Sequence, residues 1–396
     1  MSDRQNRLGP CAGIKVLEIT TMVAGPMAGQ MLADLGADVT KIEAMGGDPM
    51  RHLRPRHQDM AAGFMAMNRH KRSIQLNLKD PQGQKIARDL ALQTDVLLEN
   101  ARPGVLDRLG LSYESLREEN PGLIYASVSG FGPDGPYAQR PAFDQVIQAV
   151  SGAMYLQGGW VAPAPFRTMM VDKYSASAMA SAITAALLHR ERSGGEGQRV
   201  SVSLLDAFSS FSLIDNLYNH MWLDGEDKIP AINVTIPIRT ADGMVMGHIQ
   251  TDDQFARICR LLGREELIDD PRFQGAWNRL SNIEAMWREL EKTTQTLPTA
   301  EIMEGVGREG VPIGPVNRIE DFLADPQARH NQSIVEYSDD TYGRVLFTNY
   351  PARFEKTPAQ VAARSPTLGE HTGEILAELG YSPEDIEAAR DAGVAA

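Results

Sequence analysis

Asp172 is the residue of this sequence best suited to covalent chemistry. It begins a segment, residues 172–192, that is rich in alanine, leucine and methionine and is predicted to form one long helix. A carboxylate at a helix start is an ordinary N-cap, and the helix dipole and backbone amides also keep it ionised. Nucleophilic carboxylate catalysis uses the same arrangement beside glycine-rich loops. Position alone favours the cap, so the surrounding sequence has to decide between the two roles.

Positive charge is concentrated in the run Arg69-His70-Lys71-Arg72. The whole chain has a net charge of −13, so a ligand with several phosphate groups would need such a local reversal of sign. A solvated basic turn before a strand explains the same run without any ligand. Arg102 and Arg108, on either side of Pro103-Gly104, are open to the same two interpretations.

The loop from Thr20 to Gly25 lies where a predicted strand gives way to a helix. Amides at the start of that helix can face an anion such as a diphosphate. Many α/β turns contain glycine and alanine for close packing alone, however, and the fuller G-x-G-x-x-G pattern is absent. The loop is therefore a candidate phosphate site with a weak sequence signal.

The N-terminal half of the chain alternates predicted strands and helices. Residues 14–19 are a β-rich apolar run, Pro26 suits the first position of a helix, and Gly36 is placed to end it. Residues 38–43 predict a second strand, which completes a βαβ unit. The alternation continues with strands at 74–78, 96–100 and 123–129, and with helices at 81–93 and 113–119. This pattern predicts an α/β fold with a parallel, doubly wound sheet.

Two domains are expected from a chain of 396 residues. Residues 225–330 change character, with a short β-like stretch around 235–246 and amphipathic helices, and they predict a smaller domain. The tail regains a strand at 345–347 and a helix at 374–379, so we expect it to return to the first domain. The predicted domains are residues 1–224 with 331–396, and residues 225–330.

The composition is that of an ordinary globular protein, with 42% apolar and 23% charged residues. The acidic balance argues against DNA or RNA as a partner. Cys11 and Cys259 stand in no metal-like spacing, so neither a zinc site nor a disulfide framework is indicated, and a reducing compartment fits. Neither a signal peptide nor a membrane span is evident. We therefore expect a cytoplasmic protein with no bound metal and no membrane partner.

Several motifs, in order along nearly the whole chain, resemble those of the family III CoA-transferases, a group that includes formyl-CoA and carnitine CoA-transferases. The first four are GIKVLEITTMVAGPMAGQMLADLGADVTKIE at 13–43, NRHKRSIQLNLKDPQG at 68–83, DVLLENARPGVLDRLGL at 95–111 and NPGLIYASVSGFGPDGP at 120–136. The others are MMVDKYSASAMASAITAALLHRERSGGEGQRVSVSLLDA at 169–207, RTADG at 239–243, GVPIGPV at 310–316 and LGEHT at 368–372. The number and order of these motifs make the resemblance specific.

This resemblance implies an interlocked homodimer, in which each chain has a Rossmann-like large domain that holds both chain ends and a smaller α+β domain. It places the family's nucleophilic aspartate on Asp172. It also implies that coenzyme A and acyl-CoA bind as substrates, with no tightly bound cofactor. The CoA-binding positions that it implies are Val23, Ala24, Leu76, Asn77, Lys79, Asn100, Ala101, Arg102 and Arg108. Arg51 and Arg72 are further candidates for binding CoA.

One departure from the family pattern concerns the nucleotide. Some members carry an arginine that contacts the nucleotide directly after the position of Glu43. This chain has Ala44 there, so that contact is missing or replaced. Arg51 is the nearby candidate for a replacement.

A second departure concerns the acyl group. The α-methylacyl-CoA racemases share this fold but need a histidine in a motif similar to G-H-D, where this chain has Phe143 followed by Asp144. Phenylalanine cannot exchange a proton, so a racemase is the minority alternative. We count Phe143 and Asp144 among the residues around the bound acyl-CoA, and we expect Tyr174 and Met170 to face the acyl pocket as well.

The resemblance also implies a covalent mechanism. Asp172 would attack the donor thioester to give a mixed anhydride and then an aspartyl-CoA thioester, and the acceptor acid would reverse the sequence. An unperturbed aspartate has a pKa of about 3.9, so we expect the nucleophile to be ionised at neutral pH without a general base. Two alternatives stay open: an acyl-CoA racemase or isomerase, and a non-catalytic CoA-binding protein. The sequence does not identify the two acids.

Overall fold

The computed structural model describes residues 9–225 and 235–396. They divide into two compact units: a large unit up to Asp215 together with residues 332–396, and a small unit of residues 216–331. Each unit has a hydrophobic core of its own. The domain boundaries expected from the sequence, 1–224 with 331–396 and 225–330, stay a prediction.

The large unit is built around a sheet of six strands in the order β5-β2-β1-β6-β7-β8, and every neighbouring pair is parallel. The strands are β1 Lys15–Ile19, β2 Asp38–Glu43, β5 Arg72–Gln75, β6 Val96–Glu99, β7 Ile124–Ser129 and β8 Arg199–Ser203. Branched side chains meet across the middle strands, where Val16 is in register with Val39 and Val96. Such strands are apolar at successive positions because a parallel sheet is covered on both faces.

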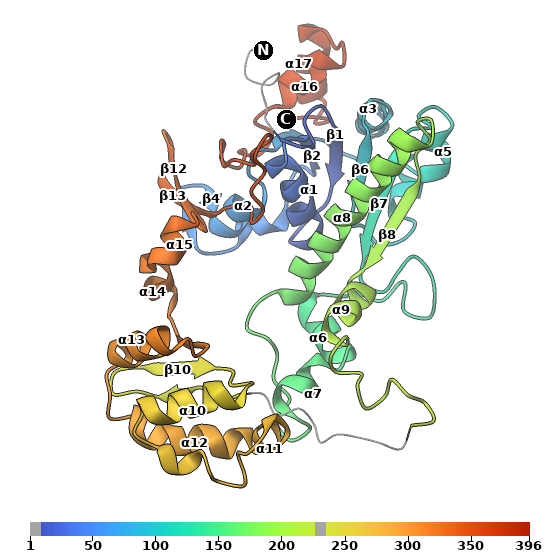
Figure 1. Cartoon of the computed structure of the whole chain (residues 1–396). Coiled ribbons are helices and arrows are strands. Elements are labelled where there is room, and N and C mark those ends of the chain that lie inside the picture. Colours follow the sequence, from blue (N-terminus) through green and yellow to red (C-terminus); the bar gives the residue numbers. More distant parts are fainter. Residues whose placement is uncertain (1–8, 226–234) are drawn as a thin grey trace. The chain divides into compact units, whose positions relative to one another are not determined.

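Helices cover both faces of this sheet, and Figure 1 shows α1 and α8 on the same face. That face packs against α1 Ala24–Asp34, α6 Asp144–Val150, α7 Ala153–Gly158, α8 Met170–Arg192 and α9 Leu204–Ser212. The other face packs against α3 Pro81–Leu92, α4 Val105–Arg108, α5 Tyr113–Arg117, α16 Thr372–Glu378 and α17 Pro383–Asp391. The predicted α/β fold with a doubly wound parallel sheet is confirmed.

The first βαβ unit follows the sequence pattern with one change. Gly36 follows α1 with φ +98°, the left-handed conformation that glycine adopts readily. α1 begins at Ala24, so the prediction that Pro26 is the first helical residue is wrong. The next helix confirms its predicted cap, because the Asp80 side chain accepts a hydrogen bond of 2.8 Å from the Gln82 N–H at the start of α3.

Other element boundaries differ from the prediction. β5 ends at Gln75; Leu76 donates to the Glu43 carbonyl of β2 at 2.9 Å and makes an isolated antiparallel bridge with Ala395 near the C-terminus. α8 begins at Met170, earlier than the predicted start at residue 172. The sequence prediction also lacks the edge strand β8 and the strand β12 Ile334–Asp339.

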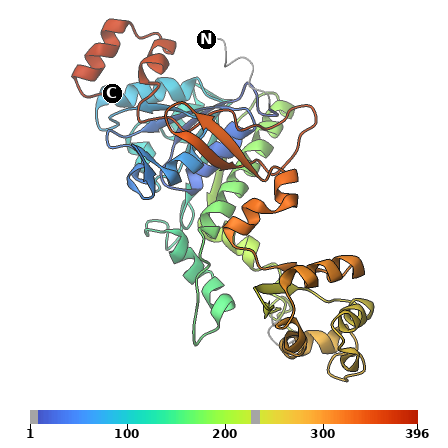
Figure 2. The same cartoon turned by 90° about the vertical axis from the view of Figure 1, so that its left-hand side faces the viewer.

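Two hairpins and two short helices complete the large unit. β12 pairs antiparallel with β13 Gly343–Thr348, and Figure 2 shows these two strands side by side. A small hydrophobic cluster joins Phe347 of this hairpin to Met60 and Phe64. The elements on the Met60 side are η1 Pro49–His52, β3 Arg56–His57, β4 Met60–Ala61 and α2 Ala62–Met67.

The small unit combines an antiparallel sheet in the order β11-β10-β9 with helices. Its core surrounds Trp287, which is fully buried. Its first helix begins with a capping box between Thr251 and Gln254. The elements of the unit are β9 Ile238–Arg239, β10 Met244–Gly247, α10 Asp252–Leu261, η2 Glu265–Leu267, α11 Ala276–Ser281, α12 Ile283–Thr294, α13 Thr299–Glu309, β11 Ile313–Pro315, α14 Ile319–Ala324 and α15 Pro326–His330.

Three further features of the described residues bear on function. Within residues 9–225 and 235–396, no helix is long and apolar enough to cross a bilayer. The same residues contain no group of three or more His, Cys, Asp or Glu side chains that could hold a metal ion. Cys11 and Cys259 are both buried and are not joined in a disulfide.

Candidate active site

The candidate site is a cavity of about 340 Å³ in the large unit, at the carboxyl ends of β1, β6 and β7. Thr21 and Met22 follow β1, Asn100 follows β6, and Ser129 ends β7. Ligands of open α/β sheets bind at this edge, beyond the carboxyl ends of the strands. The residues that line the cavity are Thr21, Met22, Val23, Ala24, Asn100, Val128, Ser129, Gly130, Ala142, Phe143, Asp144, Gln145, Met169, Asp172 and Leu204.

Four helices begin at this cavity. Its lining includes Ala24 of α1, Asp144 of α6, Asp172 of α8 and Leu204 of α9, and each of these residues lies in the first turn of its helix. The N-terminal end of a helix carries unsatisfied N–H groups and partial positive charge. These helix ends favour negative charge at the cavity, although the carboxyl groups of Asp144 and Asp172 already line it.

Asp172 is the third residue of α8, and the helix is preceded by Met169, which gives no side-chain cap. The interpretation of Asp172 as an ordinary N-cap, which its position alone favoured, is therefore wrong. Its side chain is half-buried and lines the cavity, and its backbone N–H donates to Asp144 Oδ2 at 3.2 Å. The start of α8 is thus capped by a carboxylate from another helix.

Asp144 is held firmly and is only 2% exposed. While Oδ2 accepts from the α8 backbone, Oδ1 accepts from Gln148 Nε2 at 2.5 Å. Gln148 in turn accepts from the Phe166 N–H at 2.8 Å through Oε1. The Asp144 carboxyl group therefore has a defined orientation beside Asp172.

The protonation of Asp172 differs from the expectation for a free carboxylate. Burial, and then the negative charge of Asp144, raise the pKa of Asp172 from 3.8 to about 7. The expectation that Asp172 is fully ionised at neutral pH is therefore wrong, because protonated and ionised forms coexist near pH 7. The ionised form is correspondingly more basic than an ordinary carboxylate, as befits a nucleophile in a cavity.

The loop between β1 and α1 is clamped from two sides. Met22 has φ +69°, a left-handed conformation that a residue with a side chain rarely adopts. Its N–H donates to Asp48 Oδ1 at 3.1 Å. Asn100 accepts from the Thr21 N–H at 2.9 Å and donates to the Thr21 carbonyl at 2.8 Å. Both ends of the Asn100 amide are therefore used to position the loop.

A buried ion cluster lies beneath this loop. Lys41 Nζ is 3.0 Å from Glu18 Oε1 and 3.1 Å from Asp48 Oδ2, and it donates to the Thr20 carbonyl at 2.7 Å. Lys71 Nζ is 2.8 Å from Glu18 Oε2. All four charged side chains are fully buried. Burial has the largest effect on the pKa of Lys71, which is lowered to about 8.

This arrangement corrects the interpretation of the basic run as a solvated turn. Arg69 pairs with Asp34 at 2.6 Å, and His70 Nδ1 lies 3.1 Å from the same carboxylate. With Lys71 in the ion cluster, these three side chains are buried. Arg72 is partly buried and pairs with Glu378 at 2.7 Å.

The other predicted CoA-binding residues fall into three groups. Val23, Ala24, Asn100, Phe143 and Asp144 line the cavity together with Asp172. Arg51 pairs with Glu43 at 2.6 Å and stacks over the ring of Phe64, so it already has partners inside the protein. The remaining residues do not line the cavity. Leu76 is buried, Asn77 and Ala101 are half-buried, and Lys79, Arg102 and Arg108 are exposed. As CoA contacts, all of these residues stay predictions.

Sequence reasoning missed some of the residues around the cavity. Met169 lines it in place of Met170, and Tyr174 packs against Phe211 with the ring centroids 4.7 Å apart. Gln148 was not foreseen, although its position four residues after Asp144 on a helix is a signal for contact. Asp48 has no such signal, because it reaches Met22 only through the fold.

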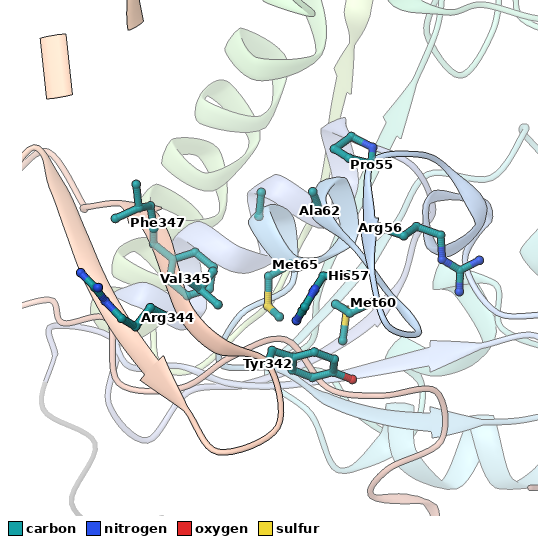
Figure 3. Close-up of a pocket in the computed structure, with 12 residues that line it drawn as sticks. Pro55, Arg56, His57, Met60, Ala62, Met65, Tyr342, Arg344, Val345 and Phe347 are labelled. Atoms are coloured by element: carbon teal, nitrogen blue, oxygen red, sulfur yellow. The ribbon is translucent and has the colours of Figure 1, made fainter. Parts of the chain in front are cut away.

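A second cavity of the large unit, of about 350 Å³, lies among β3, β4, α2 and β13. Figure 3 shows His57 in this cavity with Met60, Met65 and Tyr342. The full lining is Pro55, Arg56, His57, Met60, Ala62, Met65, Ala66, Tyr342, Arg344, Val345, Leu346 and Phe347. None of these described residues has a carboxylate or a thiol, so the second cavity does not offer the nucleophile that the first one has.

Comparisons with known proteins agree with the motif resemblance. Residues 11–372 match the model of CoA-transferase family III. The chain is 36% identical to the succinate–glutarate CoA-transferase of Agrobacterium fabrum, over 96% of this chain and 98% of the relative. It is 33% identical to the formyl-CoA:oxalate CoA-transferase of Escherichia coli O139:H28, over 96% of this chain and 98% of the relative.

A solved structure gives the same result for the fold. The crystal structure of a CAIB/BAIF family protein from Brucella suis is 35% identical in sequence and superposes with a TM-score of 0.83, covering 94% of this chain and 100% of that one. Together these findings confirm the family resemblance drawn from the motifs.

Proposed function

The chain belongs to CoA-transferase family III, and on that premise we propose that it transfers CoA between two carboxylic acids through covalent intermediates on Asp172. The observation that carries this proposal is the Asp172 carboxyl group, which lines a cavity where four helices begin. A carboxylate nucleophile and positive helix ends are the two things that this chemistry needs.

In the first half of the reaction, the Asp172 carboxylate attacks the thioester carbonyl of the donor acyl-CoA. The carbon–sulfur bond breaks, CoA leaves as a thiolate, and a mixed anhydride of the donor acid and Asp172 forms. The thiolate then attacks Cγ of Asp172 and displaces the donor as its carboxylate. The product is an aspartyl-CoA thioester, which keeps the activation of the original thioester.

In the second half, the acceptor carboxylate attacks Cγ of Asp172 and displaces the CoA thiolate. The thiolate then attacks the acceptor carbonyl of the new anhydride, which releases acceptor-CoA and restores the Asp172 carboxylate. No water, proton or redox partner is consumed. The anhydrides react with water, so the residues around the cavity have to exclude it during each cycle.

The raised pKa of Asp172 supports this use of the residue. A buried carboxylate beside a second negative charge is destabilised in its free state, and attack on the thioester moves its charge onto the carbonyl oxygen and then onto sulfur. The first-turn amides of α1 are the candidate donors for that oxygen, because in α8 the N–H groups of Met170, Asp172 and Lys173 already donate within the protein. Ala24 of α1 and Asp172 line the same cavity, which supports this role.

We propose small carboxylic acids, dicarboxylic acids among them, as the substrate class. The support comes from the relatives, one of which is named for succinate and glutarate and another for formyl-CoA and oxalate. A panel that pairs succinyl-CoA or formyl-CoA with succinate, glutarate or oxalate would identify the preferred donor and acceptor.

Trapping of the covalent intermediate tests the proposed function directly. The protein is incubated with succinyl-CoA and no acceptor, and hydroxylamine is then added. Hydroxylamine cleaves an aspartyl thioester or anhydride, so we expect a hydroxamate on Asp172, detected by the mass of the peptide that contains it. The blanks are the same protein without acyl-CoA and the Asp172→Asn variant. Turnover with no modified Asp172 would contradict the proposal.

We further propose that Arg102 and Arg108 bind the phosphate groups of CoA. Both are exposed, and neither takes part in the salt bridges found among the described residues. Replacing both with methionine is expected to raise the KM for succinyl-CoA roughly 10- to 100-fold, because charge-assisted hydrogen bonds are lost. The KM for succinyl-pantetheine, which has no phosphates, should not change.

The matched control for this pair is Arg117→Met, an exposed arginine on α5. It should leave both KM values unchanged. An equal rise in KM for the CoA and pantetheine esters of the double variant would show that the two arginines do not act on the phosphates. The homodimer implied by the resemblance and the cytoplasmic location expected from the sequence stay predictions.

A further inference from the structure

Gln148 joins the two carboxyl residues of the cavity to the segment that precedes α8. Its side chain is fully buried and stands four residues after Asp144 on α6. Nε2 donates to Asp144 Oδ1 at 2.5 Å, and Oε1 accepts from the Phe166 N–H at 2.8 Å. Both ends of the amide are engaged, so the orientation of the side chain is determined from two sides.

Through Asp144, this amide reaches the helix that carries the nucleophile. Asp144 Oδ2 accepts from the Asp172 N–H at 3.2 Å, in the first turn of α8. Met169, the residue before the helix, supplies no cap of its own. The cap of α8 therefore depends on Asp144, and the orientation of Asp144 depends on Gln148.

We propose that Gln148 is a positioning residue for CoA transfer, which orients the Asp144 carboxylate so that it both caps α8 and sets the charge beside Asp172. This inference rests on the proposed nucleophilic role of Asp172. Gln148 does not line the cavity, so it acts through Asp144 and not on the substrate.

Asp144 is the charged group that bears on the ionisation of Asp172. Among the described residues that line the cavity, only Asp144 and Asp172 can titrate. Lys173, the next residue on α8, directs its ammonium group to Thr168 Oγ1 at 2.7 Å. Asp206, on α9, accepts from the Ser203 hydroxyl at 2.6 Å. The negative charge of Asp144 contributes to the raised pKa of Asp172.

The pH dependence of transfer should show whether Gln148 orients Asp144 beside Asp172. Without the Gln148 amide, Asp144 Oδ1 loses the donor that orients it, so the carboxylate is free to turn away from Asp172. The Asp144 charge then repels the Asp172 anion less. The nucleophile would then ionise at lower pH, and the acid limb of kcat/KM would move down.

The test is Gln148→Met, which keeps the length of the side chain and removes its amide. We expect kcat to fall roughly 10- to 100-fold, because the start of α8 is no longer held, and the acid limb of kcat/KM to move down by about one pH unit. Asp144→Asn should move the limb in the same direction. In the double variant that combines Gln148→Met with Asp144→Asn, the acid limb should move no further than in Asp144→Asn alone. Gln157→Met, on the exposed side of α7, is the matched control and should leave the profile unchanged.

Each outcome decides the inference. A slower Gln148→Met enzyme with an unmoved acid limb would show a merely structural residue and overturn it, as would shifts that add in the double variant. If Gln148→Met does not fold, Gln148→Asn keeps a polar amide that is too short to reach both partners, and the same shift is expected. Transfer by Asp172→Asn would instead overturn the proposed function, whatever Gln148 does.

Discussion

Asp172→Asn is expected to abolish CoA transfer and, at the same time, to make the large unit more stable at pH 8. An amide cannot form the anhydride or the thioester, so activity should fall at least about 10⁴-fold, the size of loss seen when a covalent nucleophile is removed. Asparagine has nearly the same shape as aspartate but no charge to desolvate. The site should therefore lose its function and keep its structure.

The gain in stability follows from the direction of the pKa shift. The pKa of Asp172 is about 7 in the folded protein and has an ordinary value of 3.8. The folded state therefore holds a proton that the unfolded chain releases between these values, so stability falls as pH rises from 3.8 to about 7 and stays reduced above that. At about 1.4 kcal/mol per pKa unit the loss is at most about 4 kcal/mol, and we expect about 1–3 because the side chain is half-buried.

Calorimetry at several pH values measures this effect. The melting temperature of Asp172→Asn should exceed that of the wild type by several degrees at pH 8, by less at pH 5, and not at all below about pH 4. Asp340→Asn removes an exposed carboxylate from the turn between β12 and β13 and should show no such trend. A gap that does not change with pH would show that Asp172 is not destabilised by its surroundings.

The strands of the large unit are predictable from the sequence because a parallel sheet buries both faces. β1, β2, β6 and β7 carry branched apolar residues at their centres and lie where the sequence predicts them. β8 is at the edge of the sheet, and its sequence RVSVS alternates exposed and half-buried positions before a buried end. A strand with so few apolar residues cannot be told from a loop by composition alone.

The charges of the site are not predictable from the sequence, because each depends on a partner that only the fold brings near. In the sequence Lys71 looks like part of a basic turn, but in the fold its Nζ lies 2.8 Å from Glu18 Oε2. In the sequence Asp172 looks like an ordinary N-cap, but in the fold its N–H donates to Asp144, which lies 28 residues earlier. Family motifs identify Asp172 as the residue to consider. They do not contain the burial and the neighbouring charge that raise its pKa.

Lys41→Met is expected to destabilise the large unit by about 3–5 kcal/mol, the usual result of removing one partner from a buried ion pair. Lys41 Nζ contacts both Glu18 and Asp48, and none of the three side chains is exposed. Lys71 still pairs with Glu18 after the substitution. Asp48 loses its cation, and it is the residue that accepts from the Met22 N–H at the cavity. Transfer should therefore fall together with stability.

Urea unfolding gives the change in stability, and hydrogen exchange of peptides from residues 15–23 shows whether the β1–α1 loop has loosened. The control is Lys85→Met, whose side chain is 68% exposed and pairs with Asp89; its effect should stay below about 0.5 kcal/mol. Adding Asp48→Asn to Lys41→Met should restore part of the stability, because it removes the unpaired charge while its side-chain oxygen still accepts from Met22. A double variant less stable than Lys41→Met alone would mean that the cost comes from lost packing and not from the buried charge.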